Sequence, residues 1–246
     1  MKTLKLTVVY NGANFYGWQK QSGKRTVQGE LENALLLLTG KNIPVEGSGR
    51  TDKGVHALGQ VASLSFDGSI PVKNFKRAIN NLLSDDVYVK KVEHVSDDFH
   101  ARFSAKRKIY KYVVQVGGEK PTIMHDLRAF YPYEVDLEKM QECALILVGK
   151  HNFKGFCSSG TQVQSFEREI FDISIKKKGG VYTFEVTGNG FLYNMVRIVV
   201  GTLLEVGRNK LSIESVKKAL DLGERKHAGI VMPACGLYLK SVNYID

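Results

Sequence analysis

The segment Gly47-Ser48-Gly49-Arg50-Thr51-Asp52-Lys53-Gly54-Val55-His56-Ala57 combines residue types that can act on a substrate. Its glycines allow a backbone to approach a ligand closely. Asp52 offers a carboxylate, Arg50 a fixed cation and His56 an imidazole. The segment lies between two predicted strands and is too long for a tight hairpin, and such loops often carry function. The same composition also fits an ordinary Gly/Asp turn, so the loop is a candidate site.

Arg197 is the second candidate, because it lies within an apolar segment that predicts a helix over residues 191–206. A buried guanidinium needs a partner, since taking it out of water is costly. Glu205 lies two helical turns away, which is too far for a pair along the helix. The partner is then a structural Asp or Glu elsewhere, or Asp52. An arginine beside Asp52 would keep that carboxylate ionised, as a nucleophile requires.

Several other chemistries find no support in the sequence. No phosphate-binding loop, dinucleotide fingerprint or serine-hydrolase elbow is present. The six histidines are scattered, so no metal site is predicted. Three widely spaced cysteines, Cys143, Cys157 and Cys235, exclude a disulfide framework and fit a reducing cytoplasm. We therefore expect neither a metal nor a nucleotide cofactor.

The composition is that of a globular protein. The chain has 246 residues, of which 43% are hydrophobic, enough to bury a core. No run approaches the roughly 20 apolar residues of a membrane helix, and the polar N-terminus does not resemble a signal peptide. These features predict a soluble cytoplasmic protein without a membrane association.

The charge balance points to a polyanionic partner. Lys and Arg number 35 against 25 Asp and Glu, a formal net charge of +10, which suggests nucleic acid or else serves only solubility. Residues 101–120 hold six basic residues and one acidic residue. Lys106, Arg107 and Lys108 precede Tyr110 and Tyr112 on a predicted strand. This pattern suits an RNA surface, although tyrosine and lysine are also common in strands and at sheet edges.

Hydrophobic periodicity gives the elements that must position these residues. Strands are expected at 4–9, 43–47, 60–66, 87–95, 108–116, 170–175, 182–186 and 237–245. Helices are expected at 27–38, capped by Thr26 and closed by Gly40, after Pro71, at 137–148, at 191–206 and after Ser212. Each half reads strand, helix, strand, strand, helix, strand.

This order predicts an α+β fold of two ferredoxin-like (RRM-like) βαββαβ units packed side by side. Residues 1–104 form the unit with the Asp52 loop, and residues 105–246 form the unit with Tyr110 and Arg197. The junction has no flexible linker, so we expect a continuous antiparallel sheet with a basic cleft between the units as the default site.

The motifs of the chain, taken together, resemble the tRNA pseudouridine synthase A (TruA) family. They are Asn14-Phe15-Tyr16-Gly17-Trp18-Gln19, Arg25-Thr26-Val27-Gln28-Gly29-Glu30, Gly47–Ala57, Gly59-Gln60-Val61, Gly188–Gly207 and Gly236-Leu237-Tyr238-Leu239. They span nearly the whole chain. The resemblance implies a cofactor-independent isomerase that converts uridine to pseudouridine at positions 38, 39 and 40 of the tRNA anticodon stem-loop, and it implies a homodimer.

The resemblance also assigns roles to residues. Asp52 matches the essential aspartate, Tyr110 the tyrosine that packs on the target base, and Arg197 the arginine paired with the aspartate. Arg50 matches an arginine that helps to hold the displaced nucleotide, and Leu237 a leucine of the pocket wall. Lys53 departs from the family, which usually has a small residue there, and either a phosphate contact or a solvated side chain would explain it.

Three alternatives stay open at this point. A non-catalytic RNA-binding module would show aromatic pairs at ribonucleoprotein-motif spacing, which are missing. A hydrolase would use Asp52 with His56. A synthase of the same class would act on other uridines or other RNAs. The sequence also leaves open whether Asp52 adds to uracil C6 or acts at ribose C1′.

Overall fold

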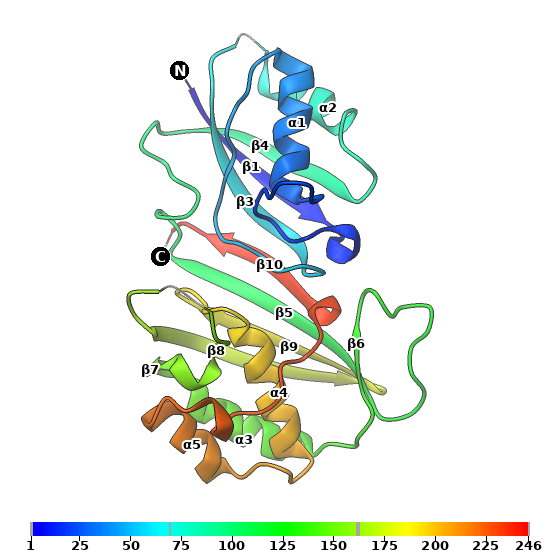
Figure 1. Ribbon diagram of the computed structural model, residues 1–246, viewed down its shortest axis with the longest axis vertical. Coiled ribbons are helices and arrows are strands. Elements are labelled where there is room, and N and C mark those ends of the chain that lie inside the picture. Colours follow the sequence, from blue (N-terminus) through cyan, green and yellow to red (C-terminus); the bar gives the residue numbers. More distant parts are fainter. Residues whose placement is uncertain (1, 69, 161–162, 246) are drawn as a thin grey trace. The chain divides into compact units, whose positions relative to one another are not determined.

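The computed structural model describes residues 2–68, 70–160 and 163–245. The chain divides into two compact units (Figure 1). Unit 1 comprises Met1–Lys106 and Tyr238–Asp246, and unit 2 comprises Arg107–Leu237. The sequence assigned residues 105–246 to one half, whereas here most of the last strand lies in unit 1. Periodicity shows that a segment is a strand but does not reveal its neighbour.

Unit 1 has the βαββαβ order predicted from the sequence. Its elements are β1 (Lys2–Tyr10), α1 (Val27–Thr39), β2 (Glu46–Gly47), β3 (His56–Phe66), α2 (Val72–Asn80), β4 (Val87–Val95) and β10 (Leu237–Asn243), with a short 3-10 helix η1 (Gly12–Asn14) after β1. Antiparallel β1 joins β3 to β4, with Leu6 opposite both Ala62 and Val92. The other edge of β3 carries β2 antiparallel and β10 parallel.

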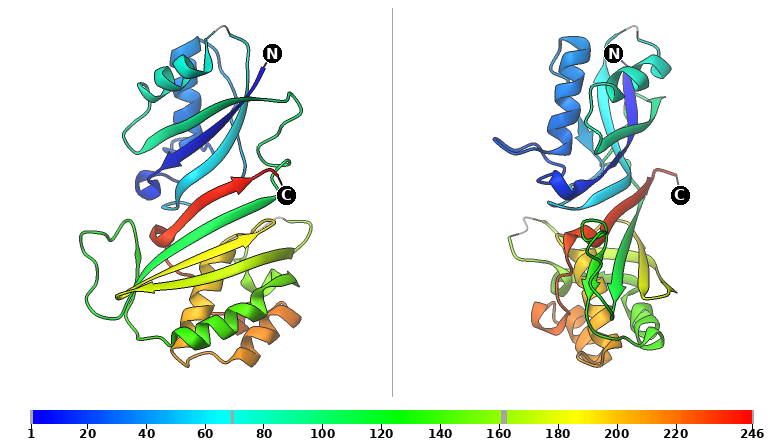
Figure 2. Two further views of the ribbon diagram at one scale, coloured as in Figure 1. Left: turned by 180° about the vertical axis from the view of Figure 1, so that it is seen from behind. Right: turned by 90° about the vertical axis from the view of Figure 1, so that its right-hand side faces the viewer.

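Helix α1 is delimited by capping residues at both ends, and its apolar face is buried. The Thr26 side chain accepts a hydrogen bond from the Gly29 amide, and Gly40 ends the helix with φ +70°. Leu31 and Leu35 on its inner face are fully buried. Helices α1 and α2 cover the same face of the unit 1 sheet (Figures 1 and 2). This packing forms the unit 1 core.

Unit 2 is built on a second, mainly antiparallel set of strands. Its elements are β5 (Arg107–Val116), β6 (Ala129–Tyr131), α3 (Leu137–Leu147), β7 (Gly149–Asn152), η2 (Phe153–Phe156), β8 (Glu167–Lys178), β9 (Val181–Gly188), α4 (Met195–Gly207), α5 (Ile213–Asp221), η3 (Arg225–His227) and η4 (Ala234–Gly236). Strands β5, β9, β8 and β7 pair antiparallel in that order, and β6 adds parallel to β5. Helices α3, α4 and α5 lie on one face of these strands (Figure 2).

The α+β class is confirmed, and one helix boundary was wrong. Helix α4 begins at Met195 rather than at Phe191, because Asn194 adopts φ +60° at the N-cap. Short β6 and β7 were not predicted. The predicted continuous sheet and basic cleft concern the placement of the two units and stay predictions. None of the helices in the described ranges has the length and apolarity needed to cross a membrane.

Candidate active site

The loop that carries Asp52 is anchored at its start to the neighbouring strand β3. The Ser48 amide donates to the Val61 carbonyl at 2.7 Å. The Ser48 hydroxyl donates to Gln60 Oε1 at 2.6 Å, and Gln60 Nε2 donates to the Gly49 carbonyl at 3.0 Å. Ser48 and Gln60 are fully buried. A buried, satisfied polar pair of this kind fixes a loop in one conformation.

The rest of the loop is held by the segment that follows β1. The Trp18 amide donates to the Thr51 carbonyl at 3.0 Å, and the Gly54 amide donates to the Phe15 carbonyl at 3.3 Å. Asp52 lies between these two contacts. The loop is therefore bound to a second chain segment on both sides of Asp52.

Asp52 opens a tight turn. The Val55 amide donates to the Asp52 carbonyl at 3.1 Å, and Gly54 has φ +80°. This combination is found in type II turns, whose third residue favours glycine. The turn exposes Lys53 and leaves Asp52 half-buried. The turn therefore fixes the backbone of Asp52.

Two glycines permit the close approach of the supporting segment. A Cβ on Gly12 would lie 2.0 Å from the Val55 carbonyl oxygen, and one on Gly17 would lie 2.4 Å from the Thr51 carbonyl oxygen. Gly17 also has φ +86°. In the sequence this segment stood out through its resemblance alone, and its supporting role was missed. Gly12 and Gly17 were the available signal, because glycine is favoured where the backbone adopts positive φ or is approached closely.

His56 has a structural task in unit 1. It is buried, and its Nδ1 accepts a hydrogen bond from the Gly12 amide at 3.0 Å. Its ring stacks on Tyr238 with centroids 4.6 Å apart. Because Nδ1 acts as an acceptor, the neutral ring carries its proton on Nε2. This arrangement gives no support to a hydrolase in which His56 serves as the base for Asp52.

Tyr110 and Tyr112 lie on the buried face of β5, as their alternation predicted. Tyr110 packs edge-on against Phe191, with ring centroids 5.2 Å apart. Tyr112 is fully buried, and its hydroxyl donates to the Pro233 carbonyl at 2.7 Å. Burial raises the pKa of the Tyr112 hydroxyl. Tyr112 is therefore a core residue, and the reading of both tyrosines as an RNA-stacking surface is wrong for Tyr112.

Arg197 lies in the first turn of α4 and is half-buried, which corrects its expected position deep within the helix. Its Nε donates to the Met232 carbonyl and its Nη1 to Asn194 Oδ1, both at 2.6 Å. Both acceptors are neutral, so neither contact cancels the guanidinium charge. Glu205 has its own partners in Tyr131, Arg208 and Lys210, as its distance along the helix predicted.

The other predicted binding residues differ in exposure. Arg50, Lys106 and Arg107 are exposed, and Lys108 is half-buried. The Arg107 guanidinium lies 5.0 Å from the centre of the Phe171 ring. Leu237 is buried at the start of β10. Unit 1 thus contains Arg50, Asp52 and Lys106, and unit 2 contains Tyr110, Arg197, Leu237 and the other two cations.

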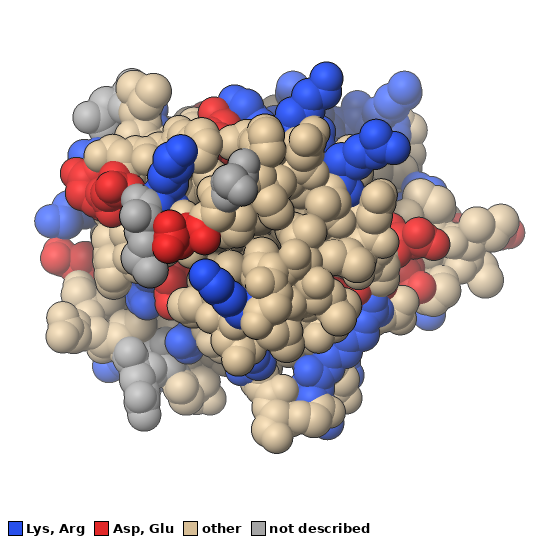
Figure 3. Space-filling model, turned by 90° about the horizontal axis from the view of Figure 1, so that it is seen from above, with Lys and Arg blue, Asp and Glu red and all other residues tan. Residues whose placement is uncertain are grey.

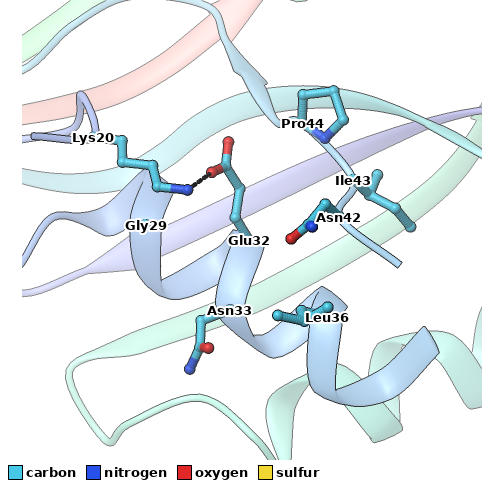
Figure 4. Close-up of a pocket in the computed structure, with 8 residues that line it drawn as sticks. All are labelled: Lys20, Gly29, Glu32, Asn33, Leu36, Asn42, Ile43 and Pro44. Atoms are coloured by element: carbon cyan, nitrogen blue, oxygen red, sulfur yellow. Dashed lines mark hydrogen bonds and ion pairs between the residues drawn. The ribbon is translucent and has the colours of Figure 1, made fainter. Parts of the chain in front are cut away.

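Two further features of the structure do not add to the site. Within the described part of the chain, no group of three or more His, Cys, Asp and Glu side chains is arranged to hold a metal ion. A pocket of about 400 Å³ lies between α1 and residues 42–44, lined by Leu36 and Pro44 among others (Figure 4). Lys20 and Glu32 pair across it at 2.7 Å, and none of the predicted site residues lines it.

The surplus positive charge does not by itself locate a binding surface. The face displayed in Figure 3 carries Asp and Glu side chains as well as Lys and Arg, with basic side chains along its upper edge and in its lower half. Individual charged residues near the Asp52 loop therefore say more about the location of a binding surface than the net charge of the chain does.

Comparison with known proteins decides the family. The family model described as "tRNA pseudouridine synthase" matches residues 6–104 and 143–245. The chain belongs to the tRNA pseudouridine synthase family. The enzyme is therefore an isomerase that forms pseudouridine from uridine in tRNA. This result excludes the non-catalytic RNA-binding module and the hydrolase as alternatives.

Individual relatives agree with this family over the full length of the chain. It is 41% identical over 244 residues to "tRNA pseudouridine synthase A" of Caldicellulosiruptor saccharolyticus, covering 99% of this chain and 100% of the relative. It is 45% identical over 245 residues to the protein of the same name in Anoxybacillus flavithermus, covering 99% of each. The solved "Crystal Structure of a Cbf5-Nop10-Gar1 Complex" matches at 12% identity with a TM-score of 0.37, covering 81% of this chain and 54% of that one, which is too low to support an argument.

Proposed function

We propose that this synthase acts at positions 38, 39 and 40 of the tRNA anticodon stem-loop, with Asp52 as its nucleophile. The observation that carries the proposal is the rigid loop around Asp52, bound on one side through Thr51 and on the other through Gly54. In a chain of this family, a carboxylate on a backbone anchored in this way is suited to repeated attack on one atom of a positioned substrate. The names of the relatives support the same substrate class.

The chemistry needs one ionised carboxylate and one proton acceptor. The bond from ribose C1′ to uracil N1 breaks, the base turns, and C1′ bonds to C5. C5 then loses a proton, N1 takes one up, and any bond to Asp52 is released so that the carboxylate is regenerated. Asp52 either adds to C6 of the ring or assists departure of the base at C1′. The product is an isomer of the substrate and no electrons are exchanged, so the proposal includes no metal or nucleotide cofactor. The target base must leave its stack, which costs a few kcal/mol.

Tyr110 and Arg197 take the supporting roles in this proposal. Tyr110 packs on the target base and is a candidate acceptor for the C5 proton; its ring is oriented by the edge-on contact with Phe191. Arg197 keeps Asp52 ionised. Its hydrogen bonds to the neutral oxygens of Asn194 and Met232 orient the guanidinium and leave its charge uncompensated by those contacts, as such a role requires.

RNA binding in this proposal uses the exposed cations. Arg50, Lys106 and Arg107, together with Lys108, contact phosphates or the displaced nucleotide, and Leu237 contributes to the pocket wall. The exposure of Arg50, Lys106 and Arg107 supports this assignment. The enzyme is proposed to act as a homodimer in the cytoplasm, where its tRNA substrate is processed.

The proposal is tested with tRNA carrying tritium at uridine C5. Pseudouridine formation releases the tritium, and we expect Asp52→Asn to lower the rate at least about 10³-fold, as loss of a nucleophile does, while tRNA affinity stays within about threefold. Asp67→Asn is the matched control, since Asp67 is an exposed aspartate just after β3 in the same unit. Substantial turnover by Asp52→Asn would remove the nucleophile assignment.

The target positions are tested separately. Mapping of pseudouridine in tRNA from cells lacking the gene should show loss at positions 38, 39 and 40 and recovery with the wild-type gene. Loss at other uridines, or in another RNA, would favour the alternative of a synthase with a different target.

A further inference from the structure

Tyr16 lies next to the Asp52 loop and holds two lysines over its ring. Its side chain is 41% exposed. Lys53 Nζ lies 4.2 Å from the ring centroid, and Lys24 Nζ lies 4.6 Å from it. Both distances are within the range of cation–π attraction. Lys53 directly follows Asp52 in the chain, so this cluster lies beside the proposed nucleophile.

The backbone fixes Tyr16 between the two segments that carry these lysines. The Tyr16 amide donates to the Arg25 carbonyl at 2.9 Å, next to Lys24. The neighbouring Phe15 carbonyl accepts from the Gly54 amide at 3.3 Å, next to Lys53. Since both contacts are made by backbone atoms, the fold brings the three side chains within reach of one another.

The charges of the two ammonium groups are not matched by a carboxylate among the described residues. Within the described residues, no ion pair joins Lys24 or Lys53 to a carboxylate, whereas Lys20 nearby pairs with Glu32. The hydrogen bond from Lys53, with the charges of both lysines, lowers the pKa of the exposed Tyr16 hydroxyl. The ring offsets only part of the mutual repulsion of two cations. A phosphate anion bound beside the ring would offset the rest.

We propose that Lys24, Tyr16 and Lys53 form a clamp for a backbone phosphate of the substrate RNA, beside the target nucleotide. The inference rests on the proposed function, because it takes Asp52 as the residue that acts on that nucleotide. Tyr16 is a positioning residue: the lysines occupy the space over its ring, so it holds them in place instead of stacking on a base. This assignment gives Lys53 a phosphate contact, one of the two roles that the sequence left open for it.

The clamp is tested by the salt dependence of tRNA binding. Binding of unmodified tRNA to wild type, Lys24→Gln, Lys53→Gln and the double variant is measured by fluorescence anisotropy between about 50 and 300 mM KCl. Each single variant should bind about three- to tenfold more weakly at about 0.1 M salt, and the double variant should lower the log–log slope by about 1, as loss of one phosphate contact does. Lys41→Gln, at an exposed lysine after α1, is the control.

One result would overturn the clamp, and a different result would overturn the proposed function on which it rests. Affinities and slopes of the Lys24 and Lys53 variants equal to those of Lys41→Gln, while the wild-type enzyme releases tritium normally, would overturn the clamp alone. Failure of the wild type to release tritium from tRNA would overturn the proposed function instead.

Tyr16 variants separate positioning from base stacking. Tyr16→Leu should weaken binding about three- to tenfold in the wild type but less than twofold in the double lysine variant, since the ring acts through the lysines. Tyr16→Phe, which keeps the ring, should lie between wild type and Tyr16→Leu. An equal loss from Tyr16→Leu in both backgrounds would show direct stacking on a base and would contradict the positioning role.

Discussion

The backbone amide of Trp18 donates a hydrogen bond of 3.0 Å to the carbonyl of Thr51, the residue before Asp52. The Trp18 side chain is only 2% exposed. Trp18 in turn packs against Gly47, where a Cβ would lie 2.5 Å from the indole. The start of the loop and the residue before its aspartate are thus both placed by one tryptophan. The position of the proposed nucleophile depends on packing in unit 1 as much as on the loop itself.

Gly17→Ala tests this dependence. Gly17 has φ +86°, and its Cβ would lie 2.4 Å from the Thr51 carbonyl oxygen. We expect a loss of at least about 3 kcal/mol in the free energy of unfolding, a Tm lower by about 6 to 12 °C, and reduced turnover. Thermal unfolding followed by circular dichroism and a tritium-release assay measure both effects.

Gly23→Ala is the control for that substitution. Gly23 also has positive φ, +68°, but nothing lies within 4 Å of its Cβ position. Gly23→Ala should lower the free energy of unfolding by only about 1 to 2 kcal/mol, the cost of an alanine in the left-handed backbone conformation. Equal effects of the two substitutions would show that the contact with Thr51 does not matter.

Most elements followed from local signals in the sequence. Thr26 and Gly40 delimited α1 because capping and a left-handed C-terminal residue are local properties. The start of α4 did not follow, because Phe191 and Leu192 continue the apolar spacing of the helix. Only the left-handed backbone of Asn194 shows that the helix begins after it. The partner of β10 is likewise a tertiary property, which periodicity cannot give.

The candidate site was predictable to a similar extent. The loop around Asp52 was found from residue types, but its support by Gly12, Gly17 and Trp18 depends on contacts between segments far apart in the chain. Tyr110 and Tyr112 are the same residue type and lie on the same face of β5, so the sequence does not distinguish them. The structure shows that both are buried and that Tyr112 is fully enclosed, with its hydroxyl bonded to the Pro233 carbonyl.

His56 should act through the fold and not through proton transfer. His56→Ala leaves the Gly12 amide, which donates to His56 Nδ1 at 3.0 Å, without its acceptor, and should cost about 1 to 3 kcal/mol of stability. His56→Asn provides an oxygen near the position of Nδ1 and should recover part of that loss. The pH profile of kcat should keep its shape in His56→Asn; loss of a titration step between about pH 6 and 7 would instead indicate a catalytic histidine.

Asn194→Gly tests whether Asn194 positions Arg197. Glycine accepts the backbone conformation of Asn194, φ +60°, but removes Oδ1, which accepts from Arg197 Nη1 at 2.6 Å. We expect a stability loss of about 1 kcal/mol and a fall in kcat of about tenfold or more, since a misplaced supporting group is costly in catalysis. Measurement of kcat and KM separately checks that the loss lies in kcat.

The control for Asn194→Gly is Asn209→Gly. Asn209 has nearly the same backbone, φ +62°, and its Oδ1 accepts from the surface Lys139 instead of Arg197. Its kcat should remain within about twofold of wild type. A similar fall in kcat for both variants would attribute the effect to the helix ends in general and not to Arg197.

Arg25 should stabilise unit 1 in a pH-dependent way. Its guanidinium donates to both carboxylate oxygens of Asp86, at 2.8 and 2.7 Å, and pairs with Glu30 at 3.0 Å. Burial acts to raise the pKa of Asp86, but the hydrogen bonds from Arg25 and Ser84 outweigh it and lower the pKa. A carboxyl whose pKa is lower in the folded state stabilises the fold above its unfolded pKa, about 4, and loses that contribution as the pH falls through its folded value.

Arg25→Gln should therefore lower the free energy of unfolding by about 1 kcal/mol at pH 7, with the difference from wild type shrinking below about pH 4. Urea unfolding at pH 7 and at pH 3 measures both values. Lys150→Gln, which breaks a pair of exposed side chains with Glu167, should change little at either pH. A difference for Arg25→Gln that is the same at both pH values would assign its contribution to packing on the Phe15 ring, whose centre lies 4.2 Å from the guanidinium, and not to its carboxylate partners.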